Sequence, residues 1–244
     1  ICVMCEKFPE SLNSNVVYIR VANTDSALAI MASNYYHNPS AQLKLIGITG
    51  TNGKTTIASL LYQLFKKYNY KVGLLSTVKI MVDDDVFKAT HTTPDSLSIN
   101  HYLSEMLDAG VEYCFMEVSS HGIHQKRIEG LTFYGGVFTN LTHDHLDYHT
   151  SFAEYRDVKK LFFDNLPKSA FALTNLDDKN GAVMLQNTRA TKKGYALKTL
   201  TDYKAKVLEK NFSGTLVSIN GTDVWTKLIG EFNVYNLLAI YGVA

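Results

Sequence analysis

The sequence predicts an α/β fold: a mostly parallel sheet with helices on both faces, a phosphate-binding loop and a small antiparallel addition. Between residues 43 and 174, short β-branched and apolar runs alternate with segments of helical periodicity. A glycine-rich stretch at 47–53 stands between the first strand and the first helix of this alternation. After about Leu176 the runs become shorter, and Asn220-Gly221 is typical of a hairpin turn.

Composition limits the class of protein. The chain has 244 residues, 46% of them hydrophobic and 19% charged, enough for one or two domains whose cores need no disulfide bonds. This composition excludes general disorder. The formal net charge is +1, so no overall field attracts nucleic acid or an anionic membrane, and we expect neither as a partner. There is no apolar run of about 18 residues and no signal-peptide pattern, so the sequence predicts a cytoplasmic protein.

The ends and the cysteines suggest a piece of a longer intracellular protein. The chain starts without Met in an expected strand and stops inside the apolar segment 233–244 without a helix stop signal. The Pro-containing stretch 37–40 is the best candidate for a linker between two domains. Cys2, Cys5 and Cys114 include no second Cys pair, so we expect no zinc site and no redox pair.

The individual elements follow from apolar periodicity and its breakers. Before the linker we expect strands at 1–4 and 16–20 and a helix at 26–36, capped by Asn23, Thr24 or Asp25. After it, the expected strands are 43–48, 72–78, 113–118, 136–139, 170–174, 206–208, 215–219 and 224–228, and the expected helices are 54–68, 95–109 and 152–165. The run Asp83-Asp84-Asp85 is expected to form the turn of a hairpin at 78–88 rather than a metal site.

The glycine-rich stretch has the residues and the context of a phosphate-binding loop. It reads Gly47-Ile48-Thr49-Gly50-Thr51-Asn52-Gly53-Lys54-Thr55-Thr56, between a strand and a helix. Glycines let backbone N–H groups converge on phosphate oxygens, Lys54 can reach the β- and γ-phosphates, and the Thr55 hydroxyl can ligate Mg²⁺. The strict loop spacing would demand glycine where Ile48 stands, so a plain glycine turn is the alternative.

The loop TGTNGKTT resembles the ATP-binding loop of the Mur ligase superfamily, which shares this spacing and includes folylpolyglutamate and cyanophycin synthetases. The resemblance covers residues 16–244 and is greatest to the ligases that add the third residue to UDP-N-acetylmuramoyl-L-alanyl-D-glutamate. It implies that 41–244 form the central ATP-binding domain, that 1–40 end the UDP-substrate domain, and that the C-terminal domain is absent. The implied nucleotide-binding residues are Gly50, Thr51, Asn52, Gly53, Lys54, Thr55 and Thr56, with Asn233 and Asn236 near the adenine.

An apolar strand delivers Glu117 near its carboxyl end, where α/β sheets present their sites. A buried carboxylate there needs a metal ion or a Lys or Arg partner. The resemblance implies that Glu117 binds Mg²⁺. It also implies that five residues contact the muramyl-peptide substrate: Thr92, Thr93, Ser119, Gln125 and Arg127.

The stretch 139–149 contains three of the eight histidines. A zinc hydrolase pattern is nearly matched, but Tyr148 stands where its last His should be. The resemblance implies instead that His145 helps to hold a second Mg²⁺. It also implies that Lys159 is carbamylated by CO₂ and bridges the metal ions; helical spacing places Lys159 on one face with Tyr155. The alternative is an exposed helix lysine, as expected of Lys160.

The resemblance implies ATP-dependent amide-bond formation through an acyl phosphate in peptidoglycan precursor synthesis, with Lys54, Glu117, His145 and Lys159 as catalytic residues. The substrates would be ATP, the UDP-MurNAc-dipeptide and a diamino acid, with meso-diaminopimelate favoured over L-lysine. We expect a monomer, and an inactive isolated fragment. The alternatives are a folylpolyglutamate or cyanophycin synthetase and a generic P-loop ATPase.

Overall fold

The computed structural model describes residues 1–142 and 148–244. Within them, eleven strands form one sheet in the order β13-β12-β11-β10-β9-β8-β3-β7-β4-β5-β6, and β1 and β2 form a separate parallel pair. The strands are β1 (Cys2–Cys5), β2 (Val17–Arg20), β3 (Lys44–Thr49), β4 (Val72–Leu75), β5 (Lys79–Val82), β6 (Asp85–Lys88), β7 (Tyr113–Glu117), β8 (Gly135–Phe138), β9 (Phe171–Asn175), β10 (Thr191–Ala196), β11 (Tyr203–Asn211), β12 (Gly214–Ile219) and β13 (Thr222–Thr226). The helices are α1 (Thr24–Tyr35), the 3₁₀ turn η1 (Pro39–Ala41), α2 (Lys54–Lys67), α3 (Ser96–Asp108), α4 (Ser120–His124), α5 (Phe152–Asp164), α6 (Gly181–Met184) and α7 (Glu231–Val243).

The middle of the sheet is parallel and has β3 at its centre. Strand β3 pairs in parallel with β7 on one side and β8 on the other, while β5, β6 and the pairs β11–β12 and β12–β13 are antiparallel. The chain moves from β3 to β4 in one direction, and from β7 through β8 to β9 in the other. Such a reversal opens a crevice at the carboxyl ends of the strands, where α/β proteins bind ligands.

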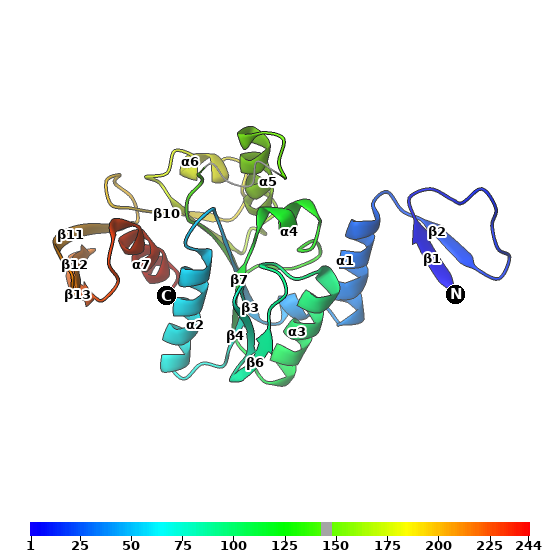
Figure 1. The fold of residues 1–244 in the computed structure, drawn as a ribbon, viewed down its shortest axis with the longest axis horizontal. Helices are drawn as coiled ribbons and strands as arrows, with labels where there is room; N and C mark the ends of the chain where they lie inside the picture. Colours follow the sequence, from blue (N-terminus) through cyan, green and yellow to red (C-terminus); the bar gives the residue numbers. More distant parts are fainter. Residues whose placement is uncertain (143–147) are drawn as a thin grey trace.

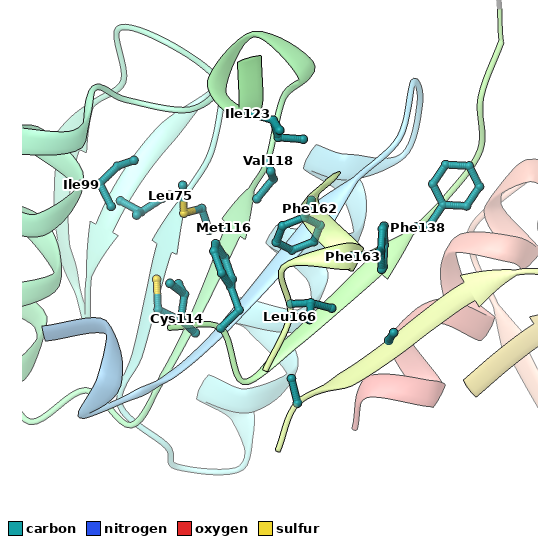
Figure 2. Packing of buried hydrophobic residues seen from close by; sticks show 14 of the residues in the cluster. Leu75, Ile99, Cys114, Met116, Val118, Ile123, Phe138, Phe162, Phe163 and Leu166 are labelled. Carbon is teal, nitrogen blue, oxygen red and sulfur yellow. The ribbon is translucent and has the colours of Figure 1, made fainter. Parts of the chain in front are cut away.

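Two apolar layers cover the sheet. Helices α2 and α7 pack on one face and α3, α4, α5 and α6 on the other. Side chains alternate along β3, so that Ile46 and Ile48 meet α2 and α7 while Leu45 joins the opposite layer. Figure 2 shows this opposite layer, in which Phe162 of α5 lies near Val118 and Met116. A Cβ at Gly47 would lie 2.6 Å from the Phe162 ring, so a glycine in β3 allows α5 to pack closely.

The two ends of the chain occupy opposite sides of the molecule in Figure 1, with the β1–β2 pair beyond α1 and strands β11–β13 beside α7. Helix α1 packs against α3, and the Ser33 hydroxyl donates a hydrogen bond to the Gly130 carbonyl at 3.3 Å. The expected domain division near residue 40 stays a prediction. In the part of the chain that the structure describes, no helix has the length and apolar character to span a membrane.

The predicted fold class is confirmed, as is the hairpin at 78–88, whose turn has Asp83 at φ +50°. The predicted turn at Asn220-Gly221 is also confirmed, with φ +47° and +88°. The expected strand 72–78 is too long, because the chain turns at Ser76 and continues as β5. Strand β10 was not predicted. The short helices α4 and α6 were not predicted either, because four or five residues carry too little periodicity to indicate a helix.

Candidate functional site

The glycine-rich loop joins β3 to α2 at the carboxyl edge of the sheet, as predicted. Gly50 and Gly53 have φ of +142° and +91°, values that residues with a Cβ rarely adopt. A Cβ at Gly50 would collide with the Thr139 hydroxyl, and one at Gly53 would lie 2.5 Å from Asn236 Oδ1. Both glycines are therefore required by backbone conformation and by close neighbours.

The positive end of helix α2 and a lysine lie at this loop. The Lys54 ammonium donates hydrogen bonds to the carbonyls of Gly50 at 2.9 Å and Thr51 at 2.8 Å. Free N–H groups in the first turn of a helix, together with its dipole, attract anions. The loop thus combines a helix N-terminus with a cation held over it.

Asn140, directly after β8, holds the loop in shape. Its side chain accepts a hydrogen bond from the Asn52 N–H at 3.0 Å and donates one to the Asn52 carbonyl at 3.1 Å. The Asn140 carbonyl also accepts the Thr51 N–H at 2.8 Å, and the Thr139 hydroxyl donates to the Asn52 carbonyl at 2.7 Å. Sequence reasoning missed Asn140; the available signal was its position directly after a strand expected beside the loop.

Glu117 is fully buried at the end of β7, next to Ile48 of β3. Its Oε2 accepts hydrogen bonds from the Thr55 hydroxyl at 2.9 Å and the Thr77 hydroxyl at 3.2 Å, and its Oε1 accepts the Thr77 N–H at 2.8 Å. Thr77 was not predicted, because it lies in a turn and matches no motif. The structure thus joins Glu117 to Thr55, as the sequence led us to expect.

The geometry of Thr55 and Glu117 fits a magnesium ion. Neighbouring ligands of an octahedral Mg²⁺, each about 2.0–2.1 Å from the ion, lie about 2.9 Å apart. Thr55 Oγ1 and Glu117 Oε2 are 2.9 Å apart. Both are oxygen donors, which is the ligand type that Mg²⁺ prefers.

The five predicted substrate residues are brought into one hydrogen-bonded region beside Glu117. The Thr93 hydroxyl donates to the Glu117 carbonyl at 2.9 Å and accepts the Ser119 N–H at 2.9 Å. Thr92 Oγ1 lies 3.1 Å from Thr77 Oγ1. The region therefore connects directly to the Thr55–Glu117 pair.

Arg127 extends this region towards α1. Its Nη1 donates to the Thr93 carbonyl at 2.7 Å, and its Nε and Nη2 donate to Gln125 Oε1 at 3.0 and 2.6 Å. A pocket of about 250 Å³ opens here, lined by Asp25, Leu28, Asp95, Ser96, Gln125 and Arg127. A guanidinium at a pocket wall suits an anionic ligand.

A second pocket, of about 230 Å³, lies on the other side of the loop, next to α7. It is lined by Asn52, Gly53, Asn140, Asn175, Asp177, Asp178, Phe232, Tyr235 and Asn236. Of the two predicted asparagines, Asn236 lines the pocket, whereas Asn233 lies behind it and accepts a hydrogen bond from the Asn236 amide at 3.2 Å. The walls of this pocket combine aromatic side chains with amide groups beside the loop, a lining that is typical of small-molecule sites.

Asp177 organises the wall of this pocket, and sequence reasoning missed it. It accepts hydrogen bonds from three successive backbone N–H groups, at Leu197, Lys198 and Thr199, and from the hydroxyls of Thr199 and Tyr235. Burial acts to raise the pKa of Asp177, but these donors outweigh it and hold the pKa far below its usual range. Burial, and then the hydrogen bond to Asp177, raise the pKa of Tyr235.

Lys159 is buried, with 1% of its surface exposed, and reaches the glycine-rich loop from α5. Its Nζ donates to the Gly50 carbonyl at 3.2 Å and lies 4.7 Å from the centre of the Tyr155 ring. The Tyr155 hydroxyl is 3.1 Å from Thr51 Oγ1. The shared face of Lys159 and Tyr155 is confirmed, and the alternative of an exposed surface lysine is wrong.

The prediction that Lys160 is exposed is wrong. Lys160 is 9% exposed and pairs with Asp164 at 2.7 Å, one helical turn further on. The prediction for His145 falls in 143–147, outside the described residues. Among the residues that are described, no cluster of three His, Cys, Asp or Glu side chains could hold a metal ion.

Comparison with known proteins agrees with this geometry. A model of the Mur ligase middle domain matches residues 48–244. A protein of Phocaeicola vulgatus named UDP-N-acetylmuramoyl-L-alanyl-D-glutamate--2,6-diaminopimelate ligase is 54% identical over 99% of this chain and 50% of its own length. The chain thus spans about half the length of the curated relatives it matches.

Solved structures share the fold. A structure of a UDP-N-acetylmuramoyl-L-alanyl-D-glutamate--2,6-diaminopimelate ligase has a TM-score of 0.85 and 26% identity, and it covers 100% of this chain and 51% of that one. A folylpolyglutamate synthase of Mycobacterium tuberculosis has a TM-score of 0.68 over 88% of this chain and 57% of its own, at 14% identity. The second likeness shows a common fold alone.

Proposed function

Because the chain belongs to the Mur ligase family, we propose that it is the ATP-binding part of a ligase that adds diaminopimelate to UDP-N-acetylmuramoyl-L-alanyl-D-glutamate. Residues 41–244 would form its central domain, and 1–40 the end of a domain that binds the UDP-linked substrate. The observation that carries the proposal is the hydrogen-bonded path from Thr55 through Glu117 to Thr93, which joins a phosphate loop to a second site.

The nucleotide would lie along the glycine-rich loop with its base in the pocket beside α7. The N–H groups of the loop and of the first turn of α2 would bind phosphate oxygens. The Lys54 ammonium would give up its hydrogen bonds to the carbonyls of Gly50 and Thr51 and bind the β- and γ-phosphates instead. Asn236 and Tyr235 would face the base. A Cβ at Gly50 or Gly53 would collide with Thr139 or Asn236, so only glycine at these positions allows the loop its present conformation, with its backbone close to these neighbours.

Thr55 and Glu117 would hold one Mg²⁺, and the support for this assignment is that two oxygen donors lie side by side at the loop. When bound, the ion offsets negative charge on the transferred phosphoryl group. A second ion, with His145 and a carbamate on Lys159 as ligands, belongs to the same proposal. The burial of Lys159 at the loop supports a role in the site rather than on the surface.

The acceptor carboxylate would bind near Arg127, Ser119 and the two threonines that precede Pro94. A carboxylate does not react with an amine near neutral pH, so one of its oxygens first takes the γ-phosphoryl group and ADP leaves. The amine nitrogen then attacks the acyl carbon, the bond to phosphate breaks, and phosphate and a proton leave. In both steps these residues position the reactants and exclude water.

The experiment is phosphate release by the full-length protein with ATP, Mg²⁺ and UDP-N-acetylmuramoyl-L-alanyl-D-glutamate, in the presence of diaminopimelate, of lysine or of no amine. We expect release only when the nucleotide peptide and diaminopimelate are both present. Phosphate release in the absence of both the nucleotide peptide and diaminopimelate would indicate a generic ATPase instead. Release that needs a folate and glutamate instead would establish a folylpolyglutamate synthetase.

A further inference from the structure

Tyr148 lies where the stretch 139–149 meets helix α4, and the proposed function gives it no role. Its ring packs against two histidines of α4: the ring centres of Tyr148 and His121 are 3.9 Å apart, and the ring of His124 meets it edge-on at 5.5 Å. His149 lies edge-on to the same ring at 4.9 Å. Three rings from two segments thus restrict the position of Tyr148, whose hydroxyl reaches the end of α4.

The Tyr148 hydroxyl contacts the side-chain amide of Gln125, the residue that follows α4. Gln125 Nε2 donates a hydrogen bond to this hydroxyl at 3.2 Å. The Tyr148 oxygen is also 2.9 Å from His124 Nδ1, which can accept the hydroxyl proton when that nitrogen is unprotonated. A hydroxyl accepts one bond while it donates another, so both contacts can exist together. The amide of Gln125 is therefore held with its NH₂ group towards Tyr148.

The oxygen of the same amide holds one edge of the Arg127 guanidinium. Gln125 Oε1 accepts hydrogen bonds from Arg127 Nε at 3.0 Å and from Nη2 at 2.6 Å. Arg127 Nη1 donates to the Thr93 carbonyl at 2.7 Å. These bonds use three of the five N–H donors of a guanidinium, so two donors can serve a ligand in the pocket that Arg127 lines.

The hydroxyl of Tyr148 is the outer support of this arrangement. Without it, the Gln125 amide keeps its bonds to Arg127 but loses the contact that fixes its NH₂ group. Glutamine and arginine are among the side chains with the most rotamer freedom to lose on being ordered. A guanidinium that is already held in place loses less of this freedom when it binds an anion, and so binds it more tightly.

We propose that Tyr148 is a positioning residue that acts through Gln125. Its hydroxyl holds the Gln125 amide, and this amide holds the Arg127 guanidinium in the orientation that binds a carboxylate of the acceptor peptide. The inference rests on the proposed function, in which the acceptor lies near Arg127. It gives a role to a tyrosine that the sequence indicated only as a departure from a zinc pattern.

The test measures binding of UDP-N-acetylmuramoyl-L-alanyl-D-glutamate to the full-length protein by calorimetry, with Mg²⁺ and saturating AMP-PNP, an ATP analogue that is not hydrolysed. Tyr148→Phe removes the hydroxyl and keeps the ring. Tyr68→Phe, at the exposed C-terminal end of α2, is the matched control. Loss of one hydrogen bond predicts that Tyr148→Phe lowers the affinity for the nucleotide peptide about 2- to 10-fold, whereas Tyr68→Phe keeps the wild-type affinity.

A double-mutant cycle separates a relay through Gln125 from a direct contact with the ligand. Gln125→Ala removes the amide between Tyr148 and Arg127. Adding Tyr148→Phe to this variant should therefore lower the affinity for the nucleotide peptide no further. In a separate titration with Mg²⁺, Tyr148→Phe should bind AMP-PNP as the wild type does, because the relay leads to Arg127 rather than to the phosphate loop.

The inference is overturned if Tyr148→Phe binds the nucleotide peptide with wild-type affinity. It is also overturned if this variant loses as much affinity for AMP-PNP, which would indicate a general structural role, or if the loss is the same in the Gln125→Ala background, which would indicate a direct contact. Absence of nucleotide-peptide binding by the wild-type protein would instead refute the proposed function, and this inference with it.

Discussion

Replacing Asp177 by Asn tests whether its hydrogen bonds hold the wall of the pocket beside α7, where we propose that the base of the nucleotide binds. Oδ2 accepts from the N–H groups of Leu197 and Lys198 and from the Tyr235 hydroxyl, and Oδ1 accepts from the N–H and hydroxyl of Thr199. In asparagine one oxygen becomes an NH₂ donor. If this NH₂ group took the place of Oδ2, it would face the backbone N–H groups of Leu197 and Lys198. If it took the place of Oδ1, it would face only the N–H of Thr199, so this second arrangement costs less.

The cost can be estimated from this arrangement. The Thr199 N–H loses its acceptor, at about 1–3 kcal/mol, and the three bonds to the other oxygen lose their charge assistance. Because the site is partly exposed to water, we expect a loss of about 2–3 kcal/mol in the free energy of unfolding at neutral pH. For a chain of this size, that corresponds to a fall of about 4–12 °C in melting temperature.

The pH dependence has a definite sign. The pKa of Asp177 is lower in the folded state than in the unfolded chain, so its contribution to stability is complete above the unfolded pKa of about 3.9 and is lost as the pH falls towards the folded value. The difference in melting temperature between wild type and Asp177→Asn should therefore stay constant from pH 8 to about pH 5 and narrow below about pH 4.

The assay is thermal unfolding followed by circular dichroism across this pH range. Asp223→Asn, an exposed carboxylate on β13, is the control and should change the melting temperature by less than about 2 °C. Tyr235→Phe removes one of the five bonds and should cost about 1 kcal/mol. A melting temperature for Asp177→Asn within 1 °C of wild type at pH 7 would refute the reasoning.

Three further predictions concern the loop and its neighbours. Glu117→Gln should leave the melting temperature nearly unchanged, because the hydroxyls around it can turn to accept from the amide, but calorimetry should find the Mg²⁺-dependent gain in AMP-PNP affinity reduced at least about tenfold. In urea unfolding, Gly53→Ala should lower the free energy of unfolding by more than Gly221→Ala does. Both glycines have positive φ, but only at Gly53 would a Cβ collide with a neighbour, Asn236. Equal losses in the two variants would contradict this prediction. In CO₂-depleted buffer, ligation by the wild type should rise on addition of bicarbonate, whereas Lys159→Ala should stay inactive; a wild type that ignores bicarbonate would refute carbamylation.

Several elements of the site could be predicted because their cause is local. Gly50 to Thr55 form a loop between a strand and a helix, and the spacing of glycine, lysine and threonine is complete within ten residues. The apolar run 43–48 predicts a strand, and the alternation of strands with helices along the chain predicts a sheet covered on both faces. The turn at Asn220-Gly221 likewise depends on the conformations that those two residues allow.

Other parts depend on contacts between distant segments. Asn140 and Asn52 are 88 residues apart, and Thr77 and Glu117 are 40 apart. They meet because β3 lies between β8 and β7, with β4 beside β7, and periodicity does not specify strand order. The same limit applies to Lys160, whose burial depends on how α5 lies on the sheet.

The sequence by itself determined the α/β class, the position of the phosphate loop and the resemblance to Mur ligases, because each rests on residues close together in the chain. Only the tertiary structure decided that Lys159 is buried at Gly50, that Asp177 holds one wall of the pocket beside α7 and that Thr77 contacts both oxygens of Glu117. The physical reason is that burial and hydrogen-bond partners are properties of packed surfaces, and strand order and helix placement bring those surfaces together.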